Sequence, residues 1–169
     1  MLRDGSGRRG EVNCMRPVQG DDRNVLDQIL HETGMFTEEE IQIAFELIDI
    51  VLHKAGQKDY LINVYDDGGA VLGYYCIGPT PATAGTYDLY WIAVRPSAQG
   101  RGIGGALTRH AEDLVKSLRG TLIIAETSSQ PRYGHTRRFY ASHGYNELAR
   151  IRDYYRVGDD LMVFGKYLT

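Results

Sequence analysis

The sequence predicts a single α/β domain, α+β in its arrangement, with a central mixed and mostly antiparallel sheet of six or seven strands flanked by about four helices. Two observations support this fold class. The chain has 169 residues, of which 43% are hydrophobic and 24% charged, and this suits one domain with a buried core. Apolar residues alternate in several short segments and recur at helical spacing in others, and the two kinds of segment are interspersed.

The N-terminal part of the chain opens with a region that has no hydrophobic periodicity. Residues 1–10 are rich in Gly and Arg, and we expect a flexible tail there, ahead of one domain at 11–169. The segment EVNCMRPVQ at 11–19 alternates well enough to predict a first strand. No internal repeat or linker marks a second domain.

Two helices are predicted after this strand. The first is capped by Asp21 or Asp22 and ends at Gly34. Thr37 with Glu40 forms a capping box, and the apolar residues that follow mark one face of the second helix. Both patterns are typical of helices that cover a core.

The rest of the chain alternates between strands and helices. A hairpin is predicted at 60–78, with its turn at Asp66–Gly69. The remaining elements are a strand at 86–94, a helix from Ile103 that Gly120 closes, a strand at 121–128, a short helix at 134–143 stopped by Gly144, and two antiparallel strands within 145–168.

The segment QGRGIGG, Gln99–Gly105, connects a strand to a helix. Gly100, Gly102 and Gly105 spell GxGxxG, the dinucleotide-binding fingerprint, and Glu126 follows at the distance expected of its ribose-binding acid. That fingerprint belongs at the first strand-to-helix turn of a repeated βαβ fold, whereas several strands precede it here. We therefore interpret the loop as a phosphate cradle, in which glycines let the backbone approach closely and a helix start directs unpaired amides at an anion.

The charge distribution favours an anion at this loop. Arg101, with Arg95 and Arg109, could add charge-assisted contacts to a pyrophosphate. Basic residues outnumber acidic ones from Arg95 to Arg138, whereas acids dominate from Asp21 to Asp67 and suit a cationic partner. Two ordinary solvated faces would explain the same counts. The net charge of −3 and the lack of a stacking aromatic platform argue against nucleic-acid binding.

The segment RPSAQGRGIGGAL resembles the acyl-CoA-binding core of the GNAT superfamily of N-acyltransferases, whose signature is Q/R-x-x-G-x-G/A. Gln99, Gly102 and Gly104 occupy the signature positions here. RRFYASHGY at 137–145 resembles the family's later helix-turn motif, and the final RDYYRVGDDLMVFGKYL is similar to the closing strands of bacterial enzymes that acetylate ribosomal-protein N-termini. The resemblance covers about residues 85–168 and implies a sheet that splays between its fourth and fifth strands.

The resemblance implies a site for acetyl-CoA as the acyl donor, with no metal. The strand before the glycines would pair its exposed backbone with the pantetheine amides, and the loop amides would hold the pyrophosphate. The residues so implied are Ile92, Ala93, Val94, Gln99, Gly100, Arg101, Gly102, Ile103, Gly104 and Gly105.

Two catalytic residues follow from the same resemblance. Glu126 matches the glutamate that acts as general base on the amine, and Tyr140 matches the tyrosine that protonates the leaving thiolate. Asp88 and Tyr90 are the reserve candidates for base or proton relay. The segment between Glu126 and Tyr140 is longer than in those relatives, and the asparagine that they often carry is replaced near Tyr133.

We expect an acetyl-CoA-dependent N-acetyltransferase that acts directly on a primary amine of a small molecule or a peptide. The acidic span from Asp21 to Asp67 would frame the acceptor side and favour a cationic acceptor. The alternative is a non-catalytic acyl-CoA-binding regulatory module, which has no use for Glu126 or Tyr140. A nucleotide-dependent oxidoreductase is a third candidate.

Location and assembly follow from weaker signals. No long uncharged apolar run occurs, and the N-terminus lacks the apolar middle of a signal peptide, so a cytoplasmic protein without a membrane partner is expected. Exposed edge strands near the C-terminus favour a homodimer.

Overall fold

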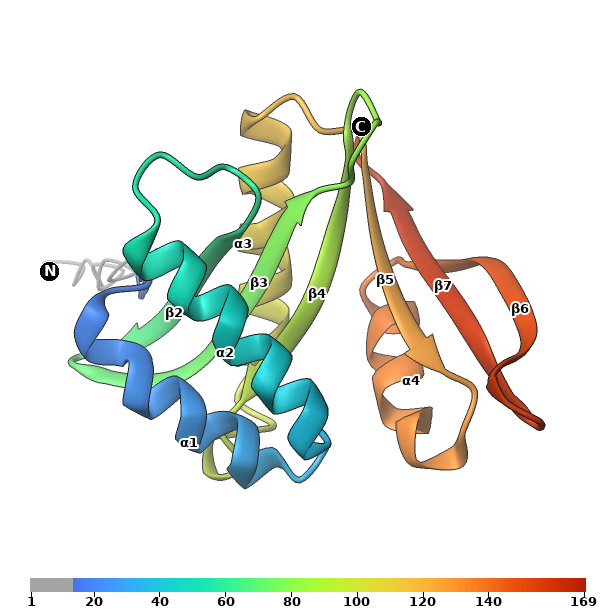
Figure 1. Ribbon diagram of the computed structural model, residues 1–169, viewed down its shortest axis with the longest axis horizontal. Helices are drawn as coiled ribbons and strands as arrows, with labels where there is room; N and C mark the ends of the chain where they lie inside the picture. The colour runs from blue at the N-terminus through green and yellow to red at the C-terminus, as the bar shows by residue number, and fades with distance from the viewer. Residues whose placement is uncertain (1–13) are drawn as a thin grey trace, which may run out of the picture.

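A seven-stranded sheet with the order β1-β2-β3-β4-β5-β7-β6 forms the centre of the computed structural model, which describes residues 14–169 (Figure 1). The strands are β1 (Met15–Pro17), β2 (Leu61–Asp67), β3 (Ala70–Pro79), β4 (Thr86–Val94), β5 (Leu122–Ser128), β6 (Asn146–Arg156) and β7 (Asp159–Tyr167). The helices are α1 (Arg23–Thr33), α2 (Glu38–His53), α3 (Ile103–Ser117) and α4 (Gly134–Ser142). The predicted fold class is confirmed, while the prediction of a tail at 1–10 lies outside the described residues.

The fourth and fifth strands separate along most of their length. β4 and β5 form the only parallel pair among the described strands, and their register joins Thr86–Asp88 to Leu122–Ile124. Beyond these residues the two strands diverge, as Figure 1 shows. The splay that the family resemblance implies is therefore present, and it leaves one edge of β4 without a neighbouring strand.

A β-bulge in β4 accompanies the splay. Along β3 the partners change from Cys76 with Trp91 to Ile77 with Leu89, so Tyr90 is the extra residue. The alternation of side chains shifts at this point. Trp91 packs under α1 and α2, whereas Leu89 packs under α3.

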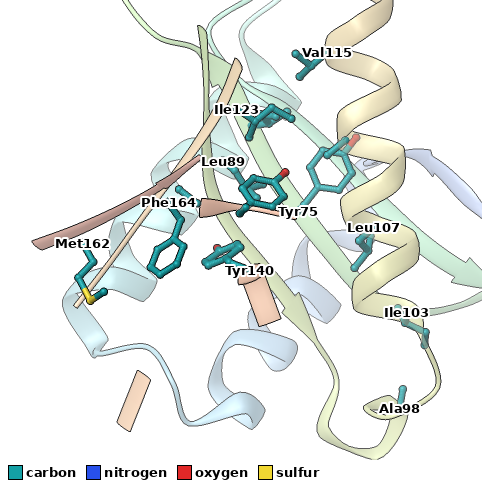
Figure 2. Close-up of a cluster of buried hydrophobic side chains, with 14 residues drawn as sticks. Tyr75, Leu89, Ala98, Ile103, Leu107, Val115, Ile123, Tyr140, Met162 and Phe164 are labelled. Atoms are coloured by element: carbon teal, nitrogen blue, oxygen red, sulfur yellow. The ribbon is translucent and has the colours of Figure 1, made fainter. Parts of the chain in front are cut away.

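Two hydrophobic clusters cover the two faces of the sheet. Tyr74 and Tyr75 are adjacent on β3 and belong to different clusters, as the alternation of a strand requires. α1 and α2 cover one face, and α3 covers the other (Figure 1). The second cluster continues past Ile123 to Tyr140 of α4 and Phe164 of β7 (Figure 2). The cluster under α3 thus connects the two halves of the sheet that separate between β4 and β5.

Local sequence signals correctly predict two helix boundaries. α1 ends at Gly34, whose φ of 62° lies in the left-handed region. The capping box before α2 is formed, since the Glu40 amide donates to Thr37 Oγ1 at 3.2 Å and the Thr37 amide donates to Glu40 Oε2 at 2.7 Å. These predictions are confirmed.

Asp22 occupies the predicted N-cap position of α1, but its side chain bonds elsewhere. Gly20–Asp22 forms a short 3-10 turn ahead of α1, and Asp22 makes no side-chain capping bond to the helix. Its carboxylate instead accepts hydrogen bonds from Arg16 at 2.7 Å and from the Gln19 amide at 2.7 Å. The Asp22 carboxylate therefore binds Arg16 of β1 instead of the free amides at the start of α1.

The sheet ends at β6, the longest strand. All of its residues are exposed, and its register with β7 shifts twice. Asp153 adopts a φ of 54° within the strand. No helix in the described part of the chain is both long and apolar enough to cross a membrane.

Candidate active site

Two cavities meet at the gap between β4 and β5. The first, which we call the loop cavity, has a volume of about 530 Å³ and lies between the glycine loop, α3 and α4. The second, the hairpin cavity, has a volume of about 630 Å³ and lies between the α1–α2 connection, β4, β5 and the β6–β7 hairpin. Both cavities are lined by Ile92, Val94, Gln99, His135, Thr136 and Tyr140. A molecule in one cavity can therefore reach a molecule in the other through the gap.

Unpaired backbone amides form one end of the loop cavity. Gly100 and Gly102 have φ angles of 75° and 80°, which only glycine adopts without strain. The Ala106 amide makes the first hydrogen bond of α3, to the Gly102 carbonyl at 3.0 Å. Within residues 14–169, none of the amides from Gly100 to Gly105 donates a hydrogen bond. Together with the positive end of the α3 dipole, these N–H groups suit an anion.

The free edge of β4 forms a second binding surface. The Arg95 amide donates to the Leu72 carbonyl of β3 at 2.8 Å. Because strand amides alternate in direction, the backbone of Ala93 also faces β3, and that of Ile92 and Val94 faces the gap. The Val94 carbonyl accepts a hydrogen bond from Gln99 Nε2 at 3.1 Å, which ties the loop to the strand end.

Most of the expected cofactor-binding residues lie at the loop cavity. Eight of the ten line it, namely Ile92, Val94, Gln99, Gly100, Gly102, Ile103, Gly104 and Gly105. Ala93 lines the hairpin cavity instead, because its side chain faces α1 and α2. Arg101 forms an ion pair with Asp67 at 3.3 Å.

Only one of the three expected arginines lies at the loop cavity. Arg95 pairs with Glu32 of α1 at 2.8 Å, so both Arg95 and Arg101 are held by acids of the N-terminal half. Arg109 lines the cavity and has no ion-pair partner among the described residues. It lies one helical turn after Gly105, on the same face of α3.

α4 supplies a wall of the loop cavity that the sequence analysis did not assign. Thr136, Phe139, Tyr140 and His143 all line it. Their spacing is that of one helical face, so the pattern was available in the sequence. A Cβ at Gly104 would come within 3.0 Å of Phe139, and one at Gly105 within 2.9 Å of His143, so both glycines permit close packing of α3 against α4.

Tyr140 lies where the two cavities meet. Its residue surface is 6% exposed, and its ring stacks on Phe164 with centroids 5.9 Å apart (Figure 2). The hydroxyl forms no hydrogen bond with any described residue, and its oxygen is not one of the fully enclosed unpaired atoms, so it opens onto the cavities. Burial raises the pKa of Tyr140 to about 12, so the hydroxyl keeps its proton at neutral pH. It is a hydrogen-bond donor that still lacks an acceptor.

Glu126 lines the hairpin cavity at the start of the splay. It lies on β5, two residues beyond Ile124, which is the last residue of β5 that pairs with β4. It forms no ion pair within the described chain. Partial burial of the carboxylate, and then the negative charge of Asp88, raise its pKa above that of a free glutamate. Both causes move a carboxylate toward the range useful in proton transfer.

The two reserve candidates differ in access. Asp88 accepts a hydrogen bond from Thr80 Oγ1 at 2.8 Å and lines neither cavity. Tyr90 lines the hairpin cavity, and burial, followed by the charge of Asp88, raises its pKa to about 12. Asp88 therefore raises the pKa of Glu126 without reaching the cavities. Tyr90 can donate a hydrogen bond in the hairpin cavity but is a poor base.

A polar network fixes the outer wall of the hairpin cavity. Ser128 donates to the buried carboxylate of Asp159 at 2.5 Å, and Arg137 donates to the Ser128 carbonyl at 2.7 Å. This network joins β5, α4 and the β6–β7 hairpin. The hairpin thereby presents Tyr155 and Arg156 to the cavity.

The aromatic residues of β3, β4, the segment before α4 and β6 differ in their access to the site. Trp91, Tyr133 and Tyr155 line the hairpin cavity. Tyr74 and Tyr75 are fully buried in the core, and Tyr154 is exposed and lines neither cavity. The alternation of β3 explains the buried pair.

The acidic span contributes fewer charges to the site than its composition suggests. Several of its carboxylates are held in ion pairs away from the cavities, among them Asp22, Glu32, Asp49, Asp66 and Asp67. Of the acidic residues in this span, Glu39 and Glu40 alone line the hairpin cavity. Among residues 14–169, no cluster of His, Cys, Asp or Glu has the arrangement of a metal site.

Comparisons with known proteins identify the family. Residues 58–147 match the acetyltransferase (GNAT) domain. A structure from Desulfovibrio desulfuricans, assigned to GNAT acetyltransferases, is 39% identical, with a TM-score of 0.87 over 92% of this chain and 98% of its own. The chain belongs to the GNAT family of acetyltransferases, which the sequence analysis predicted.

Two more distant structures share the fold. The ribosomal-protein-alanine N-acetyltransferase of Brucella melitensis is 18% identical, with a TM-score of 0.70 over 91% of this chain and 99% of its own. A Salmonella typhimurium protein described as an acetyltransferase, solved with acetyl-CoA, is 18% identical, with a TM-score of 0.68 over 92% and 93%. The curated protein sequences contain no match to the chain.

Proposed function

We propose that the protein transfers the acetyl group of acetyl-CoA directly to a primary amine, which we expect to be cationic. The loop cavity would hold the donor, and the hairpin cavity the acceptor. The observation that carries this proposal is the junction at Tyr140, because a largely buried tyrosine with an unpaired hydroxyl lies where the two cavities meet.

The residues of the loop cavity fit the chemistry of CoA. The free amides of Gly100–Gly105 and the guanidinium of Arg109 suit its pyrophosphate. The backbone of Ile92 and the amide of Val94, which face the gap, suit the amide groups of its pantetheine arm, in the manner of an added strand. Ala93 has its backbone turned toward β3, so we assign it no such contact.

Glu126 serves as the general base in this proposal. An amine attacks a thioester only when it is unprotonated, so the carboxylate accepts the proton of the ammonium, directly or through a water. The new C–N bond then forms as the C–S bond breaks, and the products are an amide and free CoA. The raised pKa of Glu126 improves its match to the amine.

Tyr140 acts on the leaving sulfur. The family resemblance implies that Tyr140 protonates the thiolate. A hydroxyl with a pKa of about 12 is a weaker acid than a thiol, whose ordinary pKa is about 8.5, so full proton transfer to the sulfur is uphill. We therefore propose that Tyr140 stabilises the thiolate by donating a hydrogen bond, with the final proton coming from solvent.

The test is a coupled assay of free thiol release. The purified protein is incubated with acetyl-CoA and a panel of amines, and time-dependent thiol release that requires an amine is expected. Binding of CoA without turnover of any amine would contradict the proposal and support the non-catalytic module. A bound flavin or nicotinamide in the absorbance spectrum would instead support an oxidoreductase.

Gly104→Val is expected to weaken acetyl-CoA binding. A Cβ at this position would approach the Phe139 ring within 3.0 Å, and the two methyl groups would enter the loop cavity. We expect KM for acetyl-CoA to rise about tenfold, a change of about 1.4 kcal/mol. The matched control is Gly20→Val, because nothing lies within 4 Å of a Cβ there. An unchanged KM in a folded Gly104→Val protein would argue against a donor site in this cavity.

The cytoplasmic location and the homodimer stay predictions from the sequence. The register shifts and the positive φ of Asp153 interrupt the regular edge of β6. Such irregularities oppose edge-to-edge pairing of strands. We therefore propose that a dimer, if formed, uses side chains of the C-terminal strands rather than a continuous sheet.

A further inference from the structure

The hairpin cavity carries an excess of negative charge. Two guanidinium groups line it, those of Arg132 and Arg156. Against them stand four carboxylates, those of Glu39, Glu40, Glu126 and Asp159. The acids among these residues therefore outnumber the arginines by two, and Glu39 and Glu126 are exposed residues at the cavity wall.

Two of the four carboxylates have structural tasks. Asp159 accepts the hydrogen bond from Ser128 and lies 3.6 Å from Arg156. Glu40 accepts from the Thr37 amide at 2.7 Å as part of the capping box. These contacts engage both groups without any ligand.

The other two carboxylates are unengaged. Within the described chain, Glu39 and Glu126 form neither an ion pair nor a hydrogen bond. They come from different elements, since Glu39 lies in the first turn of α2 and Glu126 on β5. Arg132 does not neutralise them, because it lies over the Tyr133 ring at 4.5 Å and donates to the Tyr133 hydroxyl.

Aromatic and buried polar groups indicate a ligand in the same cavity. Tyr155 lies close enough to Glu40, Glu126 and Asp159 for all three charges to raise the pKa of its hydroxyl, after burial. Tyr155 lines the cavity, and its half-exposed ring can face an organic cation. Tyr140, a residue that is 6% exposed and whose hydroxyl has no partner in the described chain, is independent of the carboxylates and belongs to the same lining.

We propose that the acceptor is an aliphatic diamine or polyamine, with the reacting nitrogen at Glu126 and a second ammonium at Glu39. The place of the reacting nitrogen rests on the proposed function. The contact between Glu39 and the second ammonium requires only that the amine binds, whether or not it is acetylated. Charge balance favours this class, because two unengaged carboxylates on different walls complement two positive charges. An amine with a single charge would make no contact with the exposed Glu39 carboxylate.

A simpler role for Glu39 is to stabilise the start of α2 through the helix dipole. Glu38 lies in the same turn, carries the same charge and does not line the cavity. The pair Glu39→Gln and Glu38→Gln therefore separates the two roles, because a dipole effect applies to both positions.

The test compares cadaverine with the amino alcohol of the same chain length, in which one ammonium is replaced by a neutral hydroxyl. Calorimetric titration with CoA present measures binding, and thiol release measures turnover. For the wild-type protein we expect cadaverine to bind about tenfold more tightly than the amino alcohol. Glu39→Gln should remove this preference by weakening cadaverine alone, and Glu38→Gln should preserve it. In turnover the loss should appear in KM for the amine and leave kcat unchanged.

The outcomes separate the two proposals. Equal affinity for the two amines, or a preference that survives Glu39→Gln, contradicts the second ammonium site even if both amines are acetylated. The expected binding preference without acetylation of any amine supports the second ammonium site and contradicts the proposed function. Equal loss in Glu38→Gln and Glu39→Gln assigns the effect to the helix start.

Discussion

Glu126→Gln is expected to lower kcat by about a hundredfold to a thousandfold, the range of a lost general base. The variant keeps the size of the side chain and removes the proton acceptor. Folding raises the pKa of Glu126, so the folded state disfavours the ionised form and loses no stability when the charge is removed. We expect an unchanged or slightly higher Tm at neutral pH, measured beside steady-state kinetics.

The pH profile gives an independent test of Glu126. Activity should fall as the pH falls through the pKa of its carboxylate, which lies above that of a free glutamate. Asp88→Asn removes the nearby negative charge and keeps an oxygen that can accept from Thr80. Because that charge raises the pKa of Glu126, the acidic limb of the pH profile should move to lower pH in this variant. A limb that is unchanged in Asp88→Asn and persists in Glu126→Gln would assign the base to another group.

Tyr140→Phe is expected to lower kcat by about tenfold to a hundredfold and leave stability intact. The hydroxyl has no partner in the described structure, so its removal breaks no hydrogen bond and relieves the desolvation of a buried polar group. The ring that packs on Phe164 is retained. Steady-state kinetics and thermal unfolding of the same preparation measure the two effects.

Tyr145→Phe is the matched control for Tyr140. Its hydroxyl is fully buried without a partner, and its ring lies 5.6 Å from that of Tyr140. Tyr145 lines neither cavity. Both variants should keep their Tm, and only Tyr140→Phe should lose activity. Equal activity in the two variants would contradict a role for Tyr140 in the reaction.

Local signals in the sequence predict most of the fold. Gly34 ends α1, and Thr37 with Glu40 begins α2, because each signal acts within one helical turn. The period-two pattern of the strands predicts the hairpin at Asp66–Gly69, where β2 and β3 meet. The separation of β4 and β5 was predicted from the family resemblance alone, because no local sequence pattern encodes it.

The site was predictable where its residues share one element. The glycine loop is contiguous, and the face of α4 with Phe139 and His143 follows helical spacing. Ion pairs between distant segments were not predictable, because a charge pattern does not specify which acid meets which base. Asp67 for this reason holds Arg101 away from the loop cavity, and Glu32 holds Arg95.

The central claim is that donor and acceptor meet at Tyr140, in the gap between β4 and β5. A crystal structure of the protein with CoA tests it most directly. The account predicts the pyrophosphate on the amides of Gly100–Gly105 and the thiol sulfur within hydrogen-bonding distance of the Tyr140 hydroxyl. CoA bound outside the loop cavity, or a thiol remote from both Tyr140 and the gap, would contradict the account.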